Sequence, residues 1–383
     1  MTINTIQTNP NHLRKCIKNV VKSPTLFTKA QYIWGKPGIG KSQIVAQIAE
    51  EMNYKLFDVR LTTKDSTDLT GLPYLHEETR RTIYYIPEFF PTEQDLLDEG
   101  YDGGIVFLDE LSAAELRLQA ASYELCLDRR VGKYILPKNV MVIAAGNRVE
   151  DGAIAYDLTS ALSDRFIHYV VEPNPKDFLE YAKAKNFHPS VITMIEAKPE
   201  HLINGFTDVA ETDDKIHPSP RSWEVVSNIM HEINDDLVQK TLINGTVGAA
   251  TAQEFFYVIQ ELANLLPMEE YIKIASTGDE SAVQAVLPTE IPGLYGLGYS
   301  LPAYCDTEED FIAACFLFNV MGNMTNGLPG REIMCASMFT LFDKAQKSGG
   351  VEKARAVRRS PAYAVIREQM KEFADNDRYK KDA

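Results

Sequence analysis

Short apolar runs alternate with helical patterns over the first part of the chain. Five of these runs are predicted to be strands, at residues 30–34, 56–60, 105–110, 140–145 and 166–171. Runs in which nearly every residue is apolar are typical of parallel strands that are buried on both faces. Apolar residues at helical spacing follow the first run, and helices are also predicted at 9–22 and 111–130. The pattern therefore indicates an α/β region that ends near residue 173.

The strand pattern stops at residue 174, and helical patterns follow. They cover residues 176–187, 189–197, 220–230, 247–265, 308–321, 330–346 and 351–374. Residues 267–306, which are rich in proline and glycine, are expected to be less regular. Asn9 and Ser219, each followed by a proline, are predicted helix caps. We therefore expect three parts, an α/β core at 1–173, a helical part at 174–265 and a C-terminal helical region at 266–383.

The residues between the first strand and its helix have the pattern G-x-x-x-x-G-K-S. The residues predicted to bind nucleotide are Gly35, Lys36, Pro37, Gly38, Ile39, Gly40, Lys41, Ser42 and Gln43. Glycines let the backbone curl with its N–H groups facing phosphate oxygens, and the helix start adds positive dipole. Lys41 can reach the β- and γ-phosphates, and Ser42 can hold Mg²⁺. Strand before and helix after favour a nucleoside triphosphate site over a chance glycine-rich turn.

Polar residues follow two other predicted strands. Asp109 and Glu110 end the run at 105–110, and Asn147 follows the run at 140–145. Ligands bind at the carboxyl ends of strands in open α/β sheets. Asp109 is placed to hold Mg²⁺, and Glu110 to orient or deprotonate an attacking water. The amide of Asn147 can contact the γ-phosphate or that water.

Composition narrows the class of protein. The chain has 383 residues, 45% hydrophobic and 24% charged, which is ordinary for a globular protein of two or three domains. A net charge of −15 argues against nucleic acid as the main partner. Five widely spaced cysteines without a CxxC pair argue against a disulfide framework and a zinc site, and Cys126 and Cys315 fit buried positions. No apolar run has transmembrane length, so we expect no membrane insertion and a cytoplasmic location.

Two further features have a structural and a functional interpretation. The segment 82–91 contains several aromatic residues beside Pro87 and Pro91. We favour a hairpin folded onto its own domain over an exposed apolar loop that touches a substrate or a neighbouring subunit. His168 lies on a predicted strand without a partner at ligand spacing, so a structural role is favoured over metal binding.

The set of motifs resembles AAA+ ATPases and, within them, the MoxR family. The matching segments are 35–42 (Walker A), 105–110 (Walker B), Asn147 (sensor 1), 162–166 (arginine-finger segment) and 219–221 (sensor 2). The segment 68–71 also resembles the MoxR sequence before the helix-2 insert, and a hairpin predicted at 131–137 has the position of the pre-sensor-1 hairpin. The motifs span residues 9–265, and the short insert at 74–100 departs from the helical insert of the family.

The resemblance implies an AAA+ core with a five-stranded parallel sheet and a helical lid. It also implies a homo-oligomeric ring, expected to be a hexamer, with ATP and Mg²⁺ at subunit interfaces. Arg165 would then act in trans on the ATP that a neighbouring subunit holds. Arg221 would couple the lid to nucleotide state, in cis or in trans. Arg129, Arg130 and Arg148 are rival interface arginines.

Three functions remain open at the level of sequence. The first is an ATP-hydrolysing chaperone or remodelling motor that acts on a protein partner such as a von Willebrand A-like protein, and the set of motifs favours it. The second is a module that assembles or binds on ATP, with hydrolysis incidental. The third is a DNA-acting motor, which Arg129, Arg130 and Lys133 favour and the acidic composition opposes.

Overall fold

The computed structural model describes residues 6–78, 81–132, 134–148, 163–203, 216–324 and 330–359. Contacts between residues divide the chain into two compact units. The first consists of Met1–Glu180 with Leu202–Trp223, and the second of Tyr181–His201 with Glu224–Ala383. The domain boundaries expected near residues 173 and 265 stay predictions.

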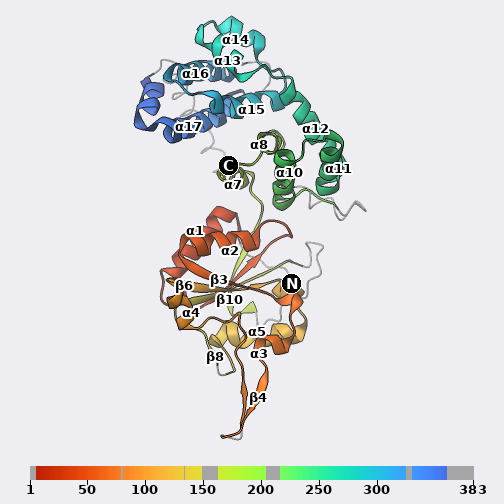
Figure 1. The fold of residues 1–383 in the computed structure, drawn as a ribbon, viewed down its shortest axis with the longest axis vertical. Coiled ribbons are helices and arrows are strands. Elements are labelled where there is room, and N and C mark those ends of the chain that lie inside the picture. Colours follow the sequence, from red (N-terminus) through yellow and green to blue (C-terminus); the bar gives the residue numbers. More distant parts are fainter. Residues whose placement is uncertain are drawn as a thin grey trace. The chain divides into compact units, whose positions relative to one another are not determined.

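A six-stranded parallel sheet forms the centre of the first unit (Figure 1). Its strands are β1 (Gln7–Thr8), β2 (Ala30–Trp34), β3 (Tyr54–Arg60), β6 (Gly103–Asp109), β9 (Val140–Gly146) and β10 (Phe166–Val171). Their spatial order is β1-β10-β2-β9-β6-β3, and every neighbouring pair is parallel. The five predicted strands are all present. The sixth, β1, pairs with β10 through only two residues, which is too short for a hydrophobic pattern to reveal.

Helices cover both faces of this sheet, as buried parallel strands require. Ile33 points to the face that α1 (Pro10–Val21) and α2 (Lys41–Glu51) cover, and Tyr32 points to the face that α5 (Leu116–Asp128) covers. Figure 1 shows α1 and α2 on one side of the sheet and α5 on the other. The first unit is therefore a three-layer α/β/α domain.

Both predicted helix caps are confirmed. Asn9 Oδ1 accepts a 2.8 Å hydrogen bond from the backbone N–H of His12, and Pro10 opens α1. The hydroxyl of Ser219 accepts a 3.1 Å hydrogen bond from the N–H of Ser222 at the start of α10 (Pro220–Glu232). These side chains satisfy N–H groups that the first turn of a helix leaves without backbone partners.

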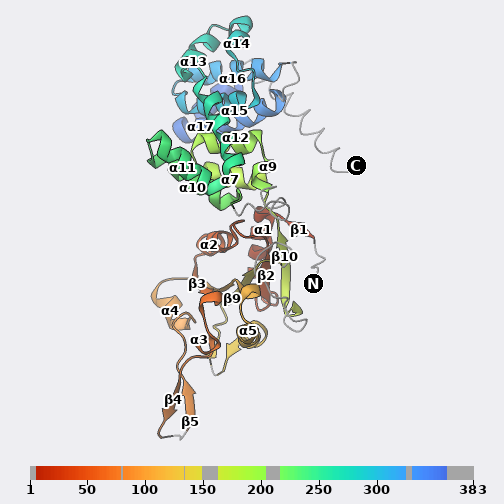
Figure 2. The same ribbon diagram turned by 90° about the vertical axis from the view of Figure 1, so that its right-hand side faces the viewer.

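The aromatic insert differs from the favoured expectation. It forms a separate antiparallel hairpin of β4 (Pro73–His76) and β5 (Arg81–Tyr84), which projects from the first unit (Figure 2). Leu75 is 80% and Tyr85 63% exposed, so the hairpin does not fold onto its own domain. The end of the insert does pack onto the domain, because Phe90 is 2% exposed and stacks on Tyr134.

Shorter elements complete the first unit. They are the 3₁₀ turn η1 (Leu61–Thr63), α3 (Ser66–Thr70), α4 (Glu93–Asp98), the 3₁₀ turn η2 (Leu111–Ala113), β7 (Arg130–Val131) and β8 (Tyr134–Ile135). The single helix predicted over 111–130 is thus η2 followed by α5. Strands β7 and β8 form the hairpin predicted at 131–137, and Lys133 lies outside the described residues.

Each described element beyond β10 is a helix. They are α7 (Pro175–Ala184), α8 (Pro189–Ala197), α9 (Glu200–Ile203), α10, α11 (Asp236–Val247), α12 (Ala249–Ala263), α13 (Met268–Ser276), α14 (Glu280–Val286), α15 (Ile291–Ser300), the 3₁₀ turn η6 (Leu301–Tyr304), α16 (Glu308–Gly322) and α17 (Gly330–Arg359). The second unit has its own core, centred on α13, α15, α16 and α17. The predicted change from α/β to all-α structure is confirmed.

The expectation of irregular structure over 267–306 is wrong. This segment forms α13, α14 and α15, and its prolines lie at or near helix starts, as Pro292 does in α15. The glycines of α15 permit close packing. A Cβ atom at Gly296 would lie 1.8 Å from Leu262, and one at Gly298 would lie 1.9 Å from the hydroxyl of Ser337. Glycine here marks contacts between helices rather than turns.

Among the helices that the structure describes, none is long and apolar enough to cross a membrane. All five cysteines are free thiols, and Cys126 and Cys315 are buried as predicted.

Candidate active site

The glycine-rich loop connects β2 to α2 at the carboxyl edge of the sheet. Gly38 and Gly40 have φ angles of 79° and 91°, a region that favours glycine. A Cβ atom at Gly35 would lie 2.3 Å from the side chain of Ile39, which packs over it. Helix α2 begins at Lys41, with the N–H groups of its first turn and its positive dipole end directed at the loop. The loop thus has the backbone form of an anion-binding site.

The Lys41 ammonium group links this loop to the neighbouring strand end. It donates hydrogen bonds to the backbone oxygens of Gly35 at 2.6 Å and Lys36 at 3.1 Å, and to Asn147 Oδ1 at 2.7 Å. Asn147 follows β9, which is adjacent to β2 in the sheet. The structure therefore brings together two residues that the sequence assigned to one phosphate site.

A second pair joins the start of α2 to the end of β6. The Ser42 hydroxyl donates a 2.9 Å hydrogen bond to Asp109 Oδ2, and the Glu110 N–H donates a 3.0 Å bond to Asp109 Oδ1. The Asp109 carboxylate is nearly buried, at 6% exposure, and Arg60 Nη2 lies 3.9 Å from it. A hydroxyl and a carboxylate oxygen at one place are the hard donors that Mg²⁺ prefers, so these residues fit the predicted ion.

Glu110 has a left-handed backbone conformation, with φ of 60° and ψ of 32°. One of its carboxylate oxygens accepts a hydrogen bond from the hydroxyl of Thr62, in η1 after β3. A non-glycine residue with positive φ costs about 1 kcal/mol and often occurs at functional sites. Sequence reasoning missed Thr62, because nothing in the chain marks a threonine after an edge strand as a partner of a distant glutamate.

Ser112 is the second residue of the site that sequence reasoning missed. Its hydroxyl accepts a 3.0 Å hydrogen bond from the N–H of Asn147 and donates a 2.9 Å bond to the oxygen of Asn147. Gly146 allows this approach, since a Cβ atom there would lie 2.5 Å from Ser112 Oγ and 2.2 Å from Tyr32 Oη. The buried serine thus fixes the backbone that carries Asn147. Its place in the segment Asp109–Ser112 is the signal that could have found it.

Arg165 lies at the opposite edge of the sheet. It directly precedes β10, whose first residue, Phe166, pairs with the first residue of β2, whereas Lys41 follows the last residue of β2. The guanidinium carbon of Arg165 lies 5.4 Å from the ring centroid of Tyr123 in α5. Burial raises the pKa of the nearby Cys126 thiol to about 12, and the Arg165 charge acts against this shift.

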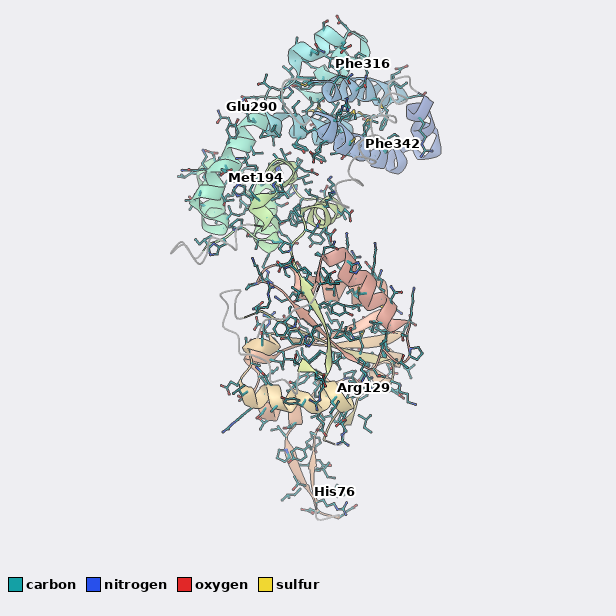
Figure 3. The ribbon with its side chains drawn as sticks, turned by 180° about the vertical axis from the view of Figure 1, so that it is seen from behind. His76, Arg129, Met194, Glu290, Phe316 and Phe342 are labelled. Carbon is teal, nitrogen blue, oxygen red and sulfur yellow. The ribbon has the colours of Figure 1, made fainter. Side chains whose placement is uncertain are left out.

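The rival arginines have structural partners within the first unit. Arg129 donates hydrogen bonds to the backbone oxygens of Pro137 at 2.8 Å and Val140 at 2.6 Å, and burial lowers the pKa of its guanidinium. Figure 3 shows Arg129 near α5, away from His76 on the projecting hairpin. Arg130 lies 3.0 Å from a Glu124 oxygen, and Arg148 donates a 2.9 Å bond to Glu172. The assignment of Arg165 as the interface arginine stays a prediction.

Arg221 is exposed in the first turn of α10. Gln43, the last residue of the predicted nucleotide set, is exposed in the first turn of α2. The other residues of the arginine-finger segment that the structure describes are Ser163, Asp164 and Phe166, while Leu162 lies outside the described residues. The catalytic and ligand roles assigned to all these residues stay predictions.

The fold and the loop define a P-loop nucleotide-binding α/β domain. Residues 31–173 match the family model described as ATPase family associated with various cellular activities (AAA). This segment, which includes Lys41, Asp109, Glu110, Asn147 and Arg165, is therefore an AAA-family ATPase domain. The match does not distinguish the MoxR family from other AAA ATPases, so the MoxR assignment stays a prediction.

One solved structure that matches is a protein from Cytophaga hutchinsonii described as a "putative ATPase". It shares 14% sequence identity with this chain at a TM-score of 0.32, over 92% of this chain and 96% of the other. The search of curated proteins finds no match.

Proposed function

We propose that this protein is an ATP-hydrolysing ring ATPase of the MoxR type that remodels or matures a protein partner. The observation that carries the proposal is the separation of Lys41 and Arg165 to opposite edges of one sheet. A parallel strand rises about 3.3 Å per residue, so the six residues of β10 separate the two edges by roughly 17 Å. Arg165 therefore cannot reach the phosphates that its own Lys41 binds, but an identical neighbour can present it.

The residues of the carboxyl edge have complementary tasks in this mechanism. The backbone N–H groups of the loop and the Lys41 ammonium bind the phosphates, and Asn147 is held against Lys41. Ser42 and Asp109 would hold Mg²⁺, which supplies charge neutralisation when bound. The Glu110 carboxylate accepts a proton from the attacking water once its hydrogen bond with Thr62 is broken. Arg165 of a neighbouring subunit stabilises the charge that develops on the transferred phosphoryl group.

An arginine supplied in trans makes hydrolysis depend on assembly. Such an arginine is worth on the order of a thousandfold or more in rate. We infer a head-to-tail ring, expected to be a hexamer, because heterologous contacts that close form rings. Arg221 at the start of α10 would couple the helical part to nucleotide state.

The test is subunit mixing. Arg165→Ala removes the arginine and keeps the site of its own subunit, whereas Glu110→Gln disables the site and keeps the arginine. Each variant alone should be inactive, and an equal mixture should regain activity at about a quarter of its interfaces, as random assembly of a heterologous ring predicts. Arg130→Ala, which loses only contacts with Glu124 and Asp128, is the matched control and should keep full activity. Full activity of Arg165→Ala at every protein concentration would rule out the proposal.

The partner is proposed to be a protein, such as a von Willebrand A-like protein. The Glu110→Gln variant should hold ATP without hydrolysing it and so retain a bound partner, which affinity capture would identify. If this variant instead supports every cellular role, the ring is an ATP-gated assembly module. Salt-sensitive DNA binding in the ATP state would favour a DNA-acting motor.

A further inference from the structure

His168 connects the strand of the phosphate-binding loop to the segment that carries Arg165. It lies on β10 beside Tyr32 of β2. Its Nδ1 atom lies 2.9 Å from Nε1 of Trp34, the last residue of β2. Its Nε2 atom lies 2.7 Å from the backbone oxygen of Ser163, two residues before Arg165. One side chain thus bridges residues from the two edges of the sheet.

The two partners select one tautomer of the imidazole. The indole N–H of Trp34 can only donate, so Nδ1 must accept. The backbone oxygen of Ser163 can only accept, so Nε2 must carry the proton and donate it. The tautomer with its proton on Nε2 satisfies both contacts.

The surrounding rings hold this connection in place. Tyr32 and Trp34 stack with centroids 4.1 Å apart, and Phe166 meets Tyr32 edge-on at 5.1 Å. The Trp34 and His168 rings are nearly parallel, at 22° and 6.1 Å. Trp34 is 5% and Tyr32 0% exposed. Because close-packed side chains have few alternative positions, a shift of Trp34 would move His168 and the backbone of Ser163.

Trp34 is itself tied to the phosphate site. Gly35, the next residue, accepts a hydrogen bond from the Lys41 ammonium and donates one of 3.3 Å to the backbone oxygen of Gly146. The connection therefore runs from the loop that binds phosphate, through Trp34 and His168, to the turn that leads into Arg165.

We propose that His168 is a positioning residue that sets where Arg165 lies for the ATP of the neighbouring subunit. This inference rests on the proposed function, because it takes Arg165 to act in trans. His168 touches neither ATP nor the reacting atoms. It holds the backbone of Ser163 through Nε2–H, and it registers the state of its own phosphate loop through Trp34. A ring could in this way pass information between successive sites.

Three substitutions separate this role from a general contribution to packing. His168→Phe keeps a ring and loses the hydrogen bonds to Trp34 and to Ser163, whose hydroxyl also lies 3.2 Å from Nε2. His168→Gln carries an amide N–H near the position of Nε2 and can still donate to Ser163. His168→Asn carries an amide oxygen near the position of Nδ1 and keeps only the contact with Trp34. If the bond to Ser163 positions Arg165, activity should follow that bond rather than ring packing.

The expected result is a loss in kcat that only one variant rescues. Misplacement of a catalytic group by about 1 Å can cost about a hundredfold, so His168→Phe should lower kcat by about tenfold or more in assembled rings. ATP affinity, measured with a fluorescent ATP analogue, should stay within about twofold, since Lys41 and the loop are unchanged. His168→Gln should recover most of kcat, and His168→Asn should not. Full kcat in His168→Phe, or an equal loss of ATP affinity, would overturn the inference.

Mixed rings show on which side of the interface His168 acts. His168→Phe mixed with Glu110→Gln should regain activity, because the second variant presents a well-placed Arg165 to the intact site of the first. His168→Phe mixed with Arg165→Ala should not exceed the low rate of His168→Phe alone. The reverse pattern would show that His168 serves its own site and would overturn the inference. Should His168→Phe fail to assemble, His168→Asn, which also loses the bond to Ser163, takes its place in both mixtures, with the same expected pattern.

Failure of the proposed function gives a different result. If Arg165→Ala mixed with Glu110→Gln does not regain activity, Arg165 does not act in trans, whatever the His168 variants show. If that mixture recovers and the His168→Phe mixture with Glu110→Gln does not, the ring mechanism stands and only the role of His168 is wrong.

Discussion

Lys41 donates a 2.7 Å hydrogen bond to the side chain of Asn147, although 106 positions separate the two residues in the chain. The sheet explains their meeting. Trp34 and Gly146, the last residues of β2 and β9, are register partners, so the residues that follow them leave the sheet side by side. The loop lysine and the asparagine are thus held together by two neighbouring strand ends.

This contact predicts different effects for two substitutions of Asn147. Asn147→Ala should lower kcat by about a hundredfold, as the loss of one preorganised polar group does at other sites, with little change in ATP affinity. Asn147→Asp places a carboxylate against the Lys41 ammonium, where it competes with phosphate, so ATP affinity should also fall by about tenfold or more. Steady-state kinetics and nucleotide titration measure both. Asn139→Ala, at the other end of β9, is the control, and equal ATP affinity in the two Asn147 variants would contradict the argument.

The bond from Thr62 to Glu110 predicts a gain of activity. The hydroxyl of Thr62 donates to a carboxylate oxygen that, in the proposed mechanism, would accept a proton from the attacking water. Thr62→Val keeps the shape of the side chain and removes this donor, so we expect the basal rate of ATP hydrolysis to rise by a few-fold, consistent with about 1 kcal/mol for one hydrogen bond. Thr63→Val removes a hydroxyl that donates only to the backbone of Arg60 and should leave the rate unchanged. Equal rates in both variants would show that Thr62 does not restrain Glu110.

Sequence alone predicted the parts of the site that lie at strand ends. Lys41, Asp109 and Asn147 each follow a buried apolar run, and parallel strands bring such ends to one edge. Their hydrogen bonds in the structure confirm that these residues lie at one edge of the sheet. Thr62 and Ser112 were not predicted, because they lie in short 3₁₀ turns whose apolar and polar pattern resembles that of any loop. Their roles depend on three-dimensional neighbours.

Two errors about the fold have a common cause. The aromatic residues near Tyr85 and the glycines near Gly296 were interpreted by residue type, as a buried hairpin and as irregular loops. The structure exposes Tyr85 on a projecting hairpin and packs Gly296 against Leu262 inside a helical core. Residue type sets what a position tolerates, whereas the surrounding elements decide its exposure.

The lowered pKa of His188 predicts that the stability of the second unit depends on pH. Burial, and then the neighbouring His231, lowers the pKa of His188 below its ordinary value of 6.5. In the window between the lowered pKa and 6.5, the unfolded chain binds more protons than the folded one. The contribution of His188 to the free energy of unfolding is therefore complete above pH 6.5 and is lost as pH falls through that window. The slope for one proton is at most about 1.4 kcal/mol per pH unit.

Denaturation across about pH 5 to 8 measures this dependence. The Nδ1 atom of His188 accepts a 3.3 Å hydrogen bond from the N–H of Ser190 at the start of α8. His188→Asn retains such an acceptor and does not titrate, so its stability should vary less with pH than that of the wild type. His231→Asn removes the neighbouring imidazole and leaves His188 to titrate, so part of the slope should remain. A wild-type slope in His188→Asn would assign the effect to another group.

The close packing around Gly146 predicts that one added methyl group can disable the site. In Gly146→Ala the added Cβ would lie 2.2 Å from Tyr32 Oη and 2.5 Å from Ser112 Oγ, both in the packed face of the sheet. Overpacking of this kind costs about 1–3 kcal/mol, and it should displace the neighbouring Asn147 from Lys41. We expect a lower unfolding temperature and a fall in kcat similar to that of Asn147→Ala. Gly245→Ala, at an exposed position of α11 with nothing within 4 Å, should instead gain about 0.5–1 kcal/mol and keep full activity. An active Gly146→Ala variant would show that Ser112 and Tyr32 do not fix the position of Asn147.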